Sequence, residues 1–568
     1  MGDLELLRRF EPVIKYTQGE LFLPAPVEDY LRGAALYVNT KGKRKARQLA
    51  PPGTLDPARL AQLGRETESE RTYLQFVERP MSRREYKQWR KGADRPKFKA
   101  SSRFASVGLL SRLIDTVMRL TLLLRGRVPG GYAAAAHQQI GKQSSFAYYG
   151  HVTRDAGYVV LQYWYLYAMN DWRSTFGGVN DHEADWEQVT IFLVDHGEDR
   201  EPEPAWVAFS SHDEVGDDLR RRWDDPDITF VDGTHPVVYA GAGSHSGAYL
   251  PGEYVTSVGV PLPTFIERLR RNLARLLPWG DGGDEVIGIP YIDYRRGDGD
   301  SVGPGQDRQW SPTVITDQTP WVRDYRGLWG LDTQDPLGGE RAPAGPRYGR
   351  DGTVRDSWRQ PVAWAGLDKE APTAHEAAAE LEALRESVLE ESQRVSSELE
   401  AARNRLRGAR SADRTAGRDA RHPSKRVVEL TAAVEALRQQ ATDLGEDLDA
   451  VDRALSRPDV IEAAHSHLRH RVMPLEAADS RGVRDRLLRI WAAASASLLM
   501  GAAGLLLLLG YRNIVGALLI LVVVMVVIEA LLRGRLVHLI ANVVVAIVII
   551  IGLMAIVSVI LGNFAQGL

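Results

Sequence analysis

The chain has 568 residues, of which 44% are hydrophobic and 26% charged, and it contains no cysteine. Its 71 basic residues nearly balance its 74 acidic residues, and the net charge of −3 excludes a mostly disordered chain or one that binds nucleic acid over its whole surface. The lack of cysteine excludes disulfides, cysteine-ligated zinc, iron–sulfur clusters and a thiol nucleophile.

The N-terminal part, residues 1–368, is expected to form a β-rich domain. Aromatic and β-branched residues are dense at 158–167, 186–194, 204–210 and 236–240, and Gly, Pro and Asp clusters separate these segments. Strands do not alternate with helices along the chain, so a parallel nucleotide-binding sheet is disfavoured. The pattern predicts a β-sandwich-like α+β domain.

Residues 30–128 are expected to be a basic, helical insertion in this domain. Residues 40–103 contain 18 basic and 7 acidic side chains, and an apolar stripe with flanking arginines runs through 106–127. Such a helix either packs on the sheet or lies on an anionic leaflet, so the segment 40–127 is a candidate for lipid contact.

A run of charged residues, 181–187, immediately precedes the strand predicted at 186–194. On an extended chain Glu183, Asp185 and Glu187 share one face, and a turn at Ala184 brings His182 round to join them. Oxygen-rich groups of this kind suit calcium or magnesium, and added imidazoles admit zinc. The alternative is that the histidine caps a strand and the carboxylates are solvated.

Two other histidines lie at predicted strand ends. His212 follows the segment 204–210, and His245 follows the segment 236–240. If the domain is an enzyme, either one is a candidate for a general acid or base.

Short motifs in this domain resemble the vacuolar protein sorting-associated protein 62-like domain family. The resemblance covers residues 10 to about 365, and its most specific part is the pair formed by His182-Glu-Ala-Asp-Trp-Glu187 and Gly243-Ser-His245. The other matching blocks are 10–16, 19–24, 163–165, 235–242, 329–330, 344–346 and Trp358.

The same acidic block is similar to the Gly-His-Arg-His-Asp-Trp-Glu motif of necrosis-inducing toxin-like proteins. Their first His, their Asp and their Glu fall on His182, Asp185 and Glu187, whereas Asp181 and Ala184 depart from the motif. This resemblance implies a β-sandwich that binds a divalent cation, with Asp171 as a candidate for the upstream acidic ligand.

Residues 372–458 are expected to form an antiparallel coiled-coil hairpin, followed by a juxtamembrane helix over 459–489. Apolar residues in the second arm recur at alternating intervals of three and four, which is a heptad pattern. They are Val427, Leu430, Val434, Leu437, Ala441, Leu444, Leu448, Val451 and Leu455. The hairpin would act as a spacer, a homo-oligomer interface or a docking site for a partner.

Three apolar runs, 490–510, 514–532 and 536–562, end the sequence. Each has the ~20 residues that a helix needs to cross the hydrocarbon layer, so we expect an integral membrane protein with three spans. Glu529 lies about one turn from Arg533 and is expected to snorkel to the interface.

The basic residues predict the orientation. They gather before the first run and between the second and third, whereas Arg512 alone lies between the first and second. The positive-inside rule therefore places the N-terminal domains in the cytoplasm and the C-terminus outside.

The sequence thus predicts a membrane-anchored cytoplasmic protein whose cation-binding β-sandwich domain recognises lipid head groups or a membrane-associated partner. One alternative is a metal-dependent hydrolase of phospholipid or a similar ester. A second alternative is an oligomeric membrane scaffold or pore.

Overall fold

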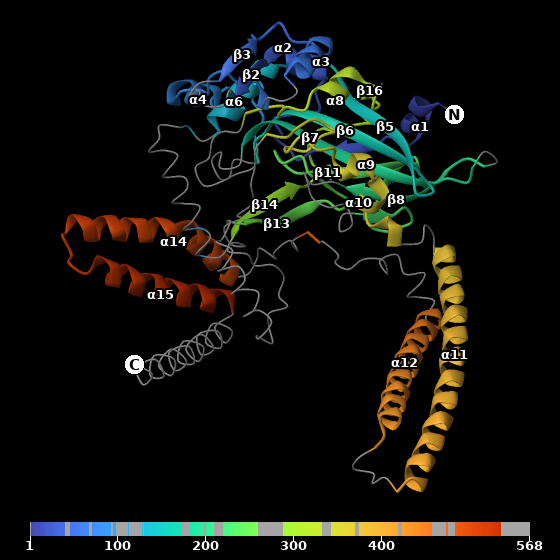
Figure 1. Ribbon diagram of the computed structural model, residues 1–568. Helices are drawn as coiled ribbons and strands as arrows, with labels where there is room; N and C mark the ends of the chain where they lie inside the picture. Colours follow the sequence, from blue (N-terminus) through green and yellow to red (C-terminus); the bar gives the residue numbers. More distant parts are fainter. Residues whose placement is uncertain are drawn as a thin grey trace.

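A computed structural model describes residues 2–534 (Figure 1), apart from 40–45, 68–70, 93–94, 98–108, 110–111, 113–127, 129, 173–180, 198–199, 210–219, 260–287, 332–341, 370–373, 418–422, 457–472 and 475–482.

A six-stranded sheet forms the centre of the N-terminal domain. Its strand order is β16 (Trp310–Val314), β5 (Phe146–Asp155), β6 (Tyr158–Asn170), β7 (His182–Val194), β8 (Glu203–Phe209) and β9 (Arg220–Arg222). Neighbours from β5 to β9 are antiparallel. Ala156 and Gly157 join β5 to β6 with φ of 45° and 82°, the two positive values of a tight hairpin turn.

A second sheet lies against the central sheet. Its path is β10 (Phe230–Val231), β11 (His235–Ala240), β1 (Val13–Lys15) and β15 (Ser301–Val302), and β12 (Gly247–Ala248) pairs with β11. The Tyr16 hydroxyl, which follows β1, lies 3.0 Å from the Tyr167 hydroxyl of β6. The opposite face of the central sheet packs on Trp321 and Trp329, so every residue of β6 is buried.

The predicted strands are therefore confirmed. The insertion predicted as helical over 30–128 contains helices at Pro57–Glu66 and Arg83–Trp89, but it also contains strands that the sequence did not predict. Three strands, β3 (Arg47–Ala50), β2 (Ala35–Asn39) and β4 (Arg71–Gln75), form a sheet there. The short apolar and aromatic segments pair across strands, as Tyr37 and Tyr73 do with stacked rings 5.6 Å apart. Of the segment 106–127, the structure describes only Leu109 and Arg112.

Helices and a separate strand pair complete the domain. The helices are α1 (Asp3–Phe10), α2 (Val27–Gly33), α3 (Pro57–Glu66), α4 (Arg83–Trp89), α6 (Gly131–Ile140), α8 (Pro320–Asp324), α9 (Asp356–Arg359), α10 (Pro361–Trp364) and η3 (Leu367–Lys369). The pair is β13 (Gly252–Gly259) with β14 (Gly288–Arg295).

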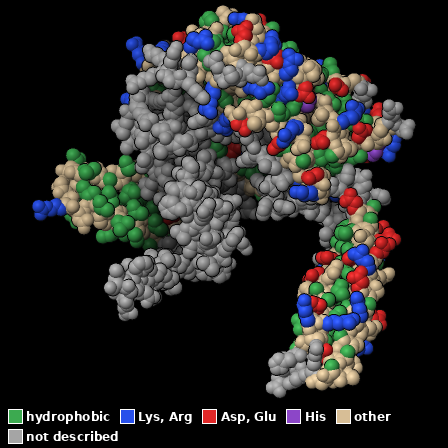
Figure 2. Space-filling view, viewed as in Figure 1, with side chains coloured by type: hydrophobic (Ala, Val, Ile, Leu, Met, Phe, Trp, Pro, Cys, Tyr) green, Lys and Arg blue, Asp and Glu red, His purple; other side chains and the backbone are tan. Residues whose placement is uncertain are grey.

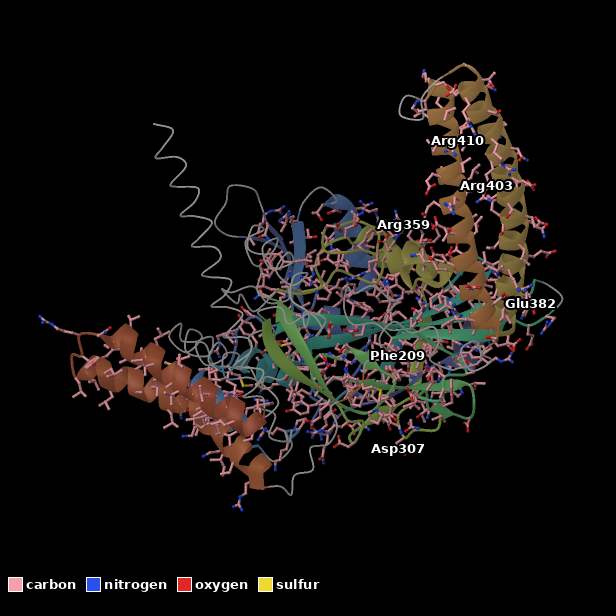
Figure 3. All side chains as sticks on the ribbon, turned by 90° about the horizontal axis from the view of Figure 1, so that it is seen from below. Phe209, Asp307, Arg359, Glu382, Arg403 and Arg410 are labelled. Carbon is pink, nitrogen blue, oxygen red and sulfur yellow. The ribbon has the colours of Figure 1, made fainter. Side chains whose placement is uncertain are left out.

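Two long helices, α11 (Ala374–Thr415) and α12 (Lys425–Leu455), lie side by side and project from the domain (Figure 1). All nine heptad positions predicted in α12 are buried or half-buried. The Nε of Arg385 donates to Asp452 Oδ1 at 2.5 Å, so the start of α11 lies beside the end of α12. Figure 3 shows Glu382 near the domain and Arg410 at the far end.

Two C-terminal helices, α14 (Val483–Leu508) and α15 (Ile514–Arg533), contain stretches that are long and apolar enough to cross a membrane. Their apolar side chains are largely exposed, unlike those of a soluble core, and hydrophobic atoms cover the visible surface of this hairpin (Figure 2). The third predicted span, 536–562, and most of the predicted juxtamembrane helix lie outside the described residues.

Gly64 marks a point where α3 touches the chain after α8. A methyl group at Gly64 would overlap the backbone carbonyl of Asp324. We expect Gly64→Ala to lower the free energy of unfolding by roughly 1–3 kcal/mol, although alanine is the better helix former. Chemical denaturation would measure this, with the exposed Gln62→Ala as the control on the same helix. Equal or greater stability of Gly64→Ala would contradict the packing described.

Candidate functional site

The acidic run splits between two faces of the central sheet because β7 contains a bulge. Glu183 and Ala184 both oppose Met169 of β6, and Ala184 has a φ of 56°. The extra residue turns Glu183 toward the face that carries Trp186 and Trp329. Asp185 keeps the opposite face, toward the second sheet.

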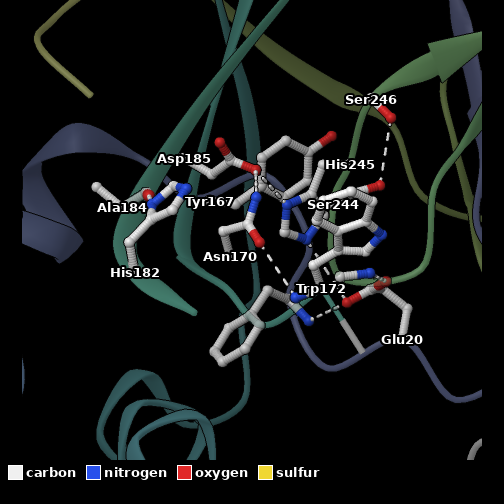
Figure 4. Close-up of polar contacts among 12 residues, drawn as sticks. Glu20, Tyr167, Asn170, Trp172, His182, Ala184, Asp185, Ser244, His245 and Ser246 are labelled. Atoms are coloured by element: carbon white, nitrogen blue, oxygen red, sulfur yellow. Dashed lines mark hydrogen bonds and ion pairs between the residues drawn. The ribbon is translucent and has the colours of Figure 1, made fainter. Parts of the chain in front are cut away.

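On that second face, His245 meets two carboxylates (Figure 4). Its Nδ1 lies 2.8 Å from Asp185 Oδ2, and its Nε2 lies 3.6 Å from Glu20 Oε1. The ring stacks on Tyr167 with centroids 3.8 Å apart and an interplanar angle of 6°. Asn170 Nδ2 also donates to Asp185 Oδ2 at 3.2 Å. We call Glu20, Asn170, Asp185 and His245 the histidine cluster.

Backbone groups fix the second carboxylate of the histidine cluster. Glu20 Oε1 accepts hydrogen bonds from the backbone N–H groups of Leu21 and Phe22, and Oε2 accepts one from Gly243 at 2.8 Å. A side chain at Gly243, where φ is 77°, would overlap Asp171. Glycine is thus required for this close approach.

Asp293 of β14 holds the loop that carries His245. It accepts hydrogen bonds from the hydroxyls of Ser244 and Ser246, each at 3.0 Å, and from Arg295 Nε at 2.8 Å. His245 itself has a φ of 54°, an uncommon value for a residue with a side chain. The glycines and serines of 241–246 therefore build a rigid loop that aims the imidazole at Asp185.

The histidine cluster favours a protonated imidazole. Burial alone would lower the pKa of His245, but the hydrogen bonds and charges of Asp185 and Glu20 outweigh it and raise this pKa to about 10. The Nδ1–H then donates to Asp185 Oδ2, whereas Nε2 faces Glu20 Oε1 at the ion-pair distance of 3.6 Å. At neutral pH the imidazolium is the cation that these two carboxylates share.

The residues predicted as metal ligands and the two histidines predicted as a general acid or base do not all meet. Asp185 and His245 are in contact, Glu187 lies buried on the same face of β7, and Asp171 lies against Gly243. His182 is buried, but its Nδ1 lies 2.8 Å from the carbonyl oxygen of Ala184. His212 lies outside the described residues.

Glu183 has a structural position, on the other face of the sheet. Its carboxylate accepts hydrogen bonds from the backbone N–H groups of Phe76, Val77 and Leu331 at 2.8–3.1 Å. Burial raises the pKa of Glu183 to about 7, against the lowering effect of these three bonds. The side chain thus joins β7 to two distant segments, and it is not part of the histidine cluster.

Sequence reasoning assigned no role to Glu20 or Asn170. Glu20 lies in the block 19–24, which contributed to the family resemblance, and Asn170 ends β6 opposite His182. No local pattern around either residue shows that it meets Asp185 or His245, because those contacts span 15 to more than 200 residues.

The donor types of the histidine cluster suit calcium, magnesium or zinc. Within the described residues, however, no group of three or more His, Asp or Glu side chains converges in the way a metal ion requires. The carboxylate oxygens approach the two ring nitrogens instead of a shared point. A divalent cation therefore stays a prediction.

A basic cavity of about 290 Å³ opens beside α4. Its lining is Tyr86, Lys87, Arg90, Lys91 and Arg95. We call these residues the α4 pocket. Arg95 Nε donates to the carbonyl of Arg90 at 2.6 Å, and the Arg95 guanidinium lies over the Trp89 ring. The acidic side chain of α4, Glu85, forms the capping box with Ser82 and an ion pair with Arg79.

No family model, curated protein or solved structure matches the chain. The two family resemblances found in the sequence therefore stay predictions from short motifs.

We expect Glu183→Ala to lower the free energy of unfolding by roughly 2–4 kcal/mol, because it leaves three backbone N–H groups without their buried acceptor. Chemical denaturation of the full chain, followed by tryptophan fluorescence, would measure the change. Glu203→Ala, at an exposed glutamate that begins β8, should change stability by less than about 0.5 kcal/mol. Equal effects of the two substitutions would show that the Glu183 contacts do not stabilise the fold.

Proposed function

We propose that the protein is a membrane-tethered binding protein whose β-rich domain recognises phosphate-bearing head groups of anionic lipids. The observation that carries this proposal is the α4 pocket. Four basic side chains and a tyrosine surround a cavity large enough for a phosphate group, in a chain that also has two apolar helices of membrane-spanning length.

Within the part of the chain that the structure describes, the basic side chains of the α4 pocket have no acidic partner. Among the described residues, no carboxylate forms an ion pair with Lys87, Arg90, Lys91 or Arg95. Basic residues near an anionic leaflet each contribute about 1 kcal/mol of attraction. The tether keeps the domain close to a lipid surface, so a weak head-group site is sufficient for function.

The proposal also includes the orientation of the protein in the membrane. Arg486 of α14 and Arg533 of α15 lie at one end of the helical hairpin, and Arg512 lies at the other. By the positive-inside rule the end with more basic residues faces the cytoplasm, where the leaflet is rich in anionic lipids. We infer that the β-rich domain works on that side.

The histidine cluster does not hold a general base. A general base needs a free lone pair on the imidazole near neutral pH. The pKa of about 10 keeps His245 protonated, and both of its nitrogens face carboxylates. His245 is therefore not a general base in this arrangement, although an imidazolium is the form that acts as a general acid. The metal-dependent hydrolase and the scaffold or pore both stay predictions.

The lipid proposal predicts that Lys87→Gln combined with Lys91→Gln weakens head-group binding by roughly tenfold or more. Full-length protein in neutral detergent would be titrated calorimetrically with dioctanoyl phosphatidic acid, dioctanoyl phosphatidylcholine and inorganic phosphate. Phosphatidic acid alone should bind in the case of a lipid site, whereas equal binding of inorganic phosphate would indicate a general anion site.

The matched control is Arg83→Gln combined with Arg84→Gln, which removes two exposed charges from the same helix outside the α4 pocket. It should leave the affinity within about twofold, since isolated surface charges contribute little. Equal weakening by both pairs, or no binding at all, would refute a head-group site in the α4 pocket.

A second candidate function, binding of a divalent cation, comes from the sequence motifs, and the histidine cluster contains donor types that suit it. Asp185, Glu20 and His245 bring two carboxylates and an imidazole together in a buried place. The ion would take the place of the shared proton, so its affinity should rise with pH. Calcium or magnesium is favoured over zinc by the number of oxygen donors.

Cation binding would raise the thermal midpoint of unfolding of the full chain. Scans with calcium, magnesium, zinc or chelator would be compared for the native chain, Asp185→Asn and Glu183→Gln. The rise should disappear in Asp185→Asn and persist in Glu183→Gln, because only Asp185 belongs to the histidine cluster. A midpoint that is indifferent to every ion would remove the metal from the proposal.

A further inference from the structure

The α14–α15 hairpin contains a buried charged group. Glu529 of α15 is 5% exposed, so it does not snorkel away from the protein as its sequence position predicts. Its Oε1 accepts a hydrogen bond from Arg533 Nε at 2.9 Å, and its Oε2 accepts one from Trp491 Nε1 of α14 at 3.2 Å.

A residue from the N-terminal half of the chain completes this group. The Nη2 of Arg112 forms an ion pair with Glu529 Oε2 and lies 3.1 Å from the hydroxyl of Ser495 in α14. The Arg112 and Glu529 side chains are only 2% and 6% exposed. More than 400 residues of sequence separate the two charges.

Apolar contacts surround the ion pair. Leu109, three residues before Arg112 in the sequence, is buried together with Leu499 of α14 and Met525 of α15. Half-buried residues of both helices pack around them, among them Leu518, Leu521 and Val522. The contact is thus a packed interface. Leu109 packs on apolar side chains of the hairpin, and Arg112 pairs with its carboxylate.

The position of the ion pair along the helices defines its depth. Glu529 lies four residues, or about 6 Å, from Arg533, and Trp491 lies five residues beyond Arg486 on the antiparallel helix. The interface is therefore about one turn inside the end of the hairpin that carries the basic residues. At that depth a carboxylate is costly unless it is paired, and an arginine can reach it from the head-group region.

We propose that Leu109 and Arg112 belong to the membrane-embedded unit, and that the α14–α15 hairpin is the docking site for these two residues. The β-rich domain is then attached to the membrane at two points of the sequence, through Arg112 and through the chain that leads to α14. This attachment does not depend on lipid binding by the α4 pocket or on a metal in the histidine cluster.

Cross-linking tests this proposal without background, because the natural chain has no cysteine. Full-length chain carrying Leu109→Cys and Met525→Cys would be reconstituted in vesicles and treated with a short bismaleimide. We expect an intramolecular product in high yield. The control pair is Leu109→Cys with Leu508→Cys, which lies at the far end of α14 and is 87% exposed. It should give a several-fold lower yield.

An exchange of the two charges tests whether cross-linking depends on the ion pair or only on the general proximity of Leu109 to the hairpin. In the cross-linking pair, Arg112→Glu should abolish most of the product by placing two carboxylates together, and adding Glu529→Arg should restore it. A product that is insensitive to Arg112→Glu, or no product in the native-charge background, would overturn the proposal.

The accessibility of Leu109 in vesicles is a separate test of whether this residue lies in the membrane. Leu109→Cys alone should react with a charged maleimide more slowly in vesicles than Leu4→Cys, which is 44% exposed at the N-terminus. Arg112→Glu should raise its rate to that of Leu4→Cys. If Leu109→Cys in the native-charge background reacts as fast as Leu4→Cys, the segment is outside the lipid and the proposal fails.

Discussion

The bulge in β7 is the constraint on which the β-rich domain depends. A regular strand would place Glu183 and Asp185 on one face, where two ionised carboxylates would be buried together at a high cost. The extra residue at Ala184 separates them. Glu183 then accepts backbone hydrogen bonds from the layer that contains Phe76 and Leu331, while Asp185 receives His245 from the second sheet. One local irregularity thus gives each face of the central sheet a polar contact to the layer that covers it.

Three of the buried acidic groups described above are each compensated by donors or by a positive charge, although their surroundings differ. Glu183 is compensated by three backbone dipoles, Asp185 by an imidazolium, and Glu529 by Arg112 with Arg533. In each case at least one partner comes from a segment far away in the sequence. Such pairs add little net stability compared with an apolar core, but removing one partner leaves an uncompensated charge. They therefore specify which segments pack together more than they strengthen the packing.

The sequence predicts those parts of the fold that a local pattern determines. Aromatic and β-branched density located β6 and β7, spacings of three and four located the inward face of α12, and apolar length located α14 and α15. The sequence did not predict the bulge, because the bulge depends on pairing with Met169. It gave Glu20 no role, because the partner His245 is far away in the chain. The strand β2 was not predicted because it is a short apolar segment within a basic region. Its aromatic partner, Tyr73, lies in β4.

The antiparallel geometry of the α11–α12 hairpin means that its length does not make it a spacer. Helices of 42 and 31 residues extend for about 63 and 46 Å, which would make a tall spacer if the chain ran along them once. The chain instead returns, and Arg385 meets Asp452 where the hairpin leaves the domain. An antiparallel arm of this kind adds no distance between its two ends. The length of the arm therefore does not set the separation of the β-rich domain from the apolar helices, and the Arg112 contact is the described link between them.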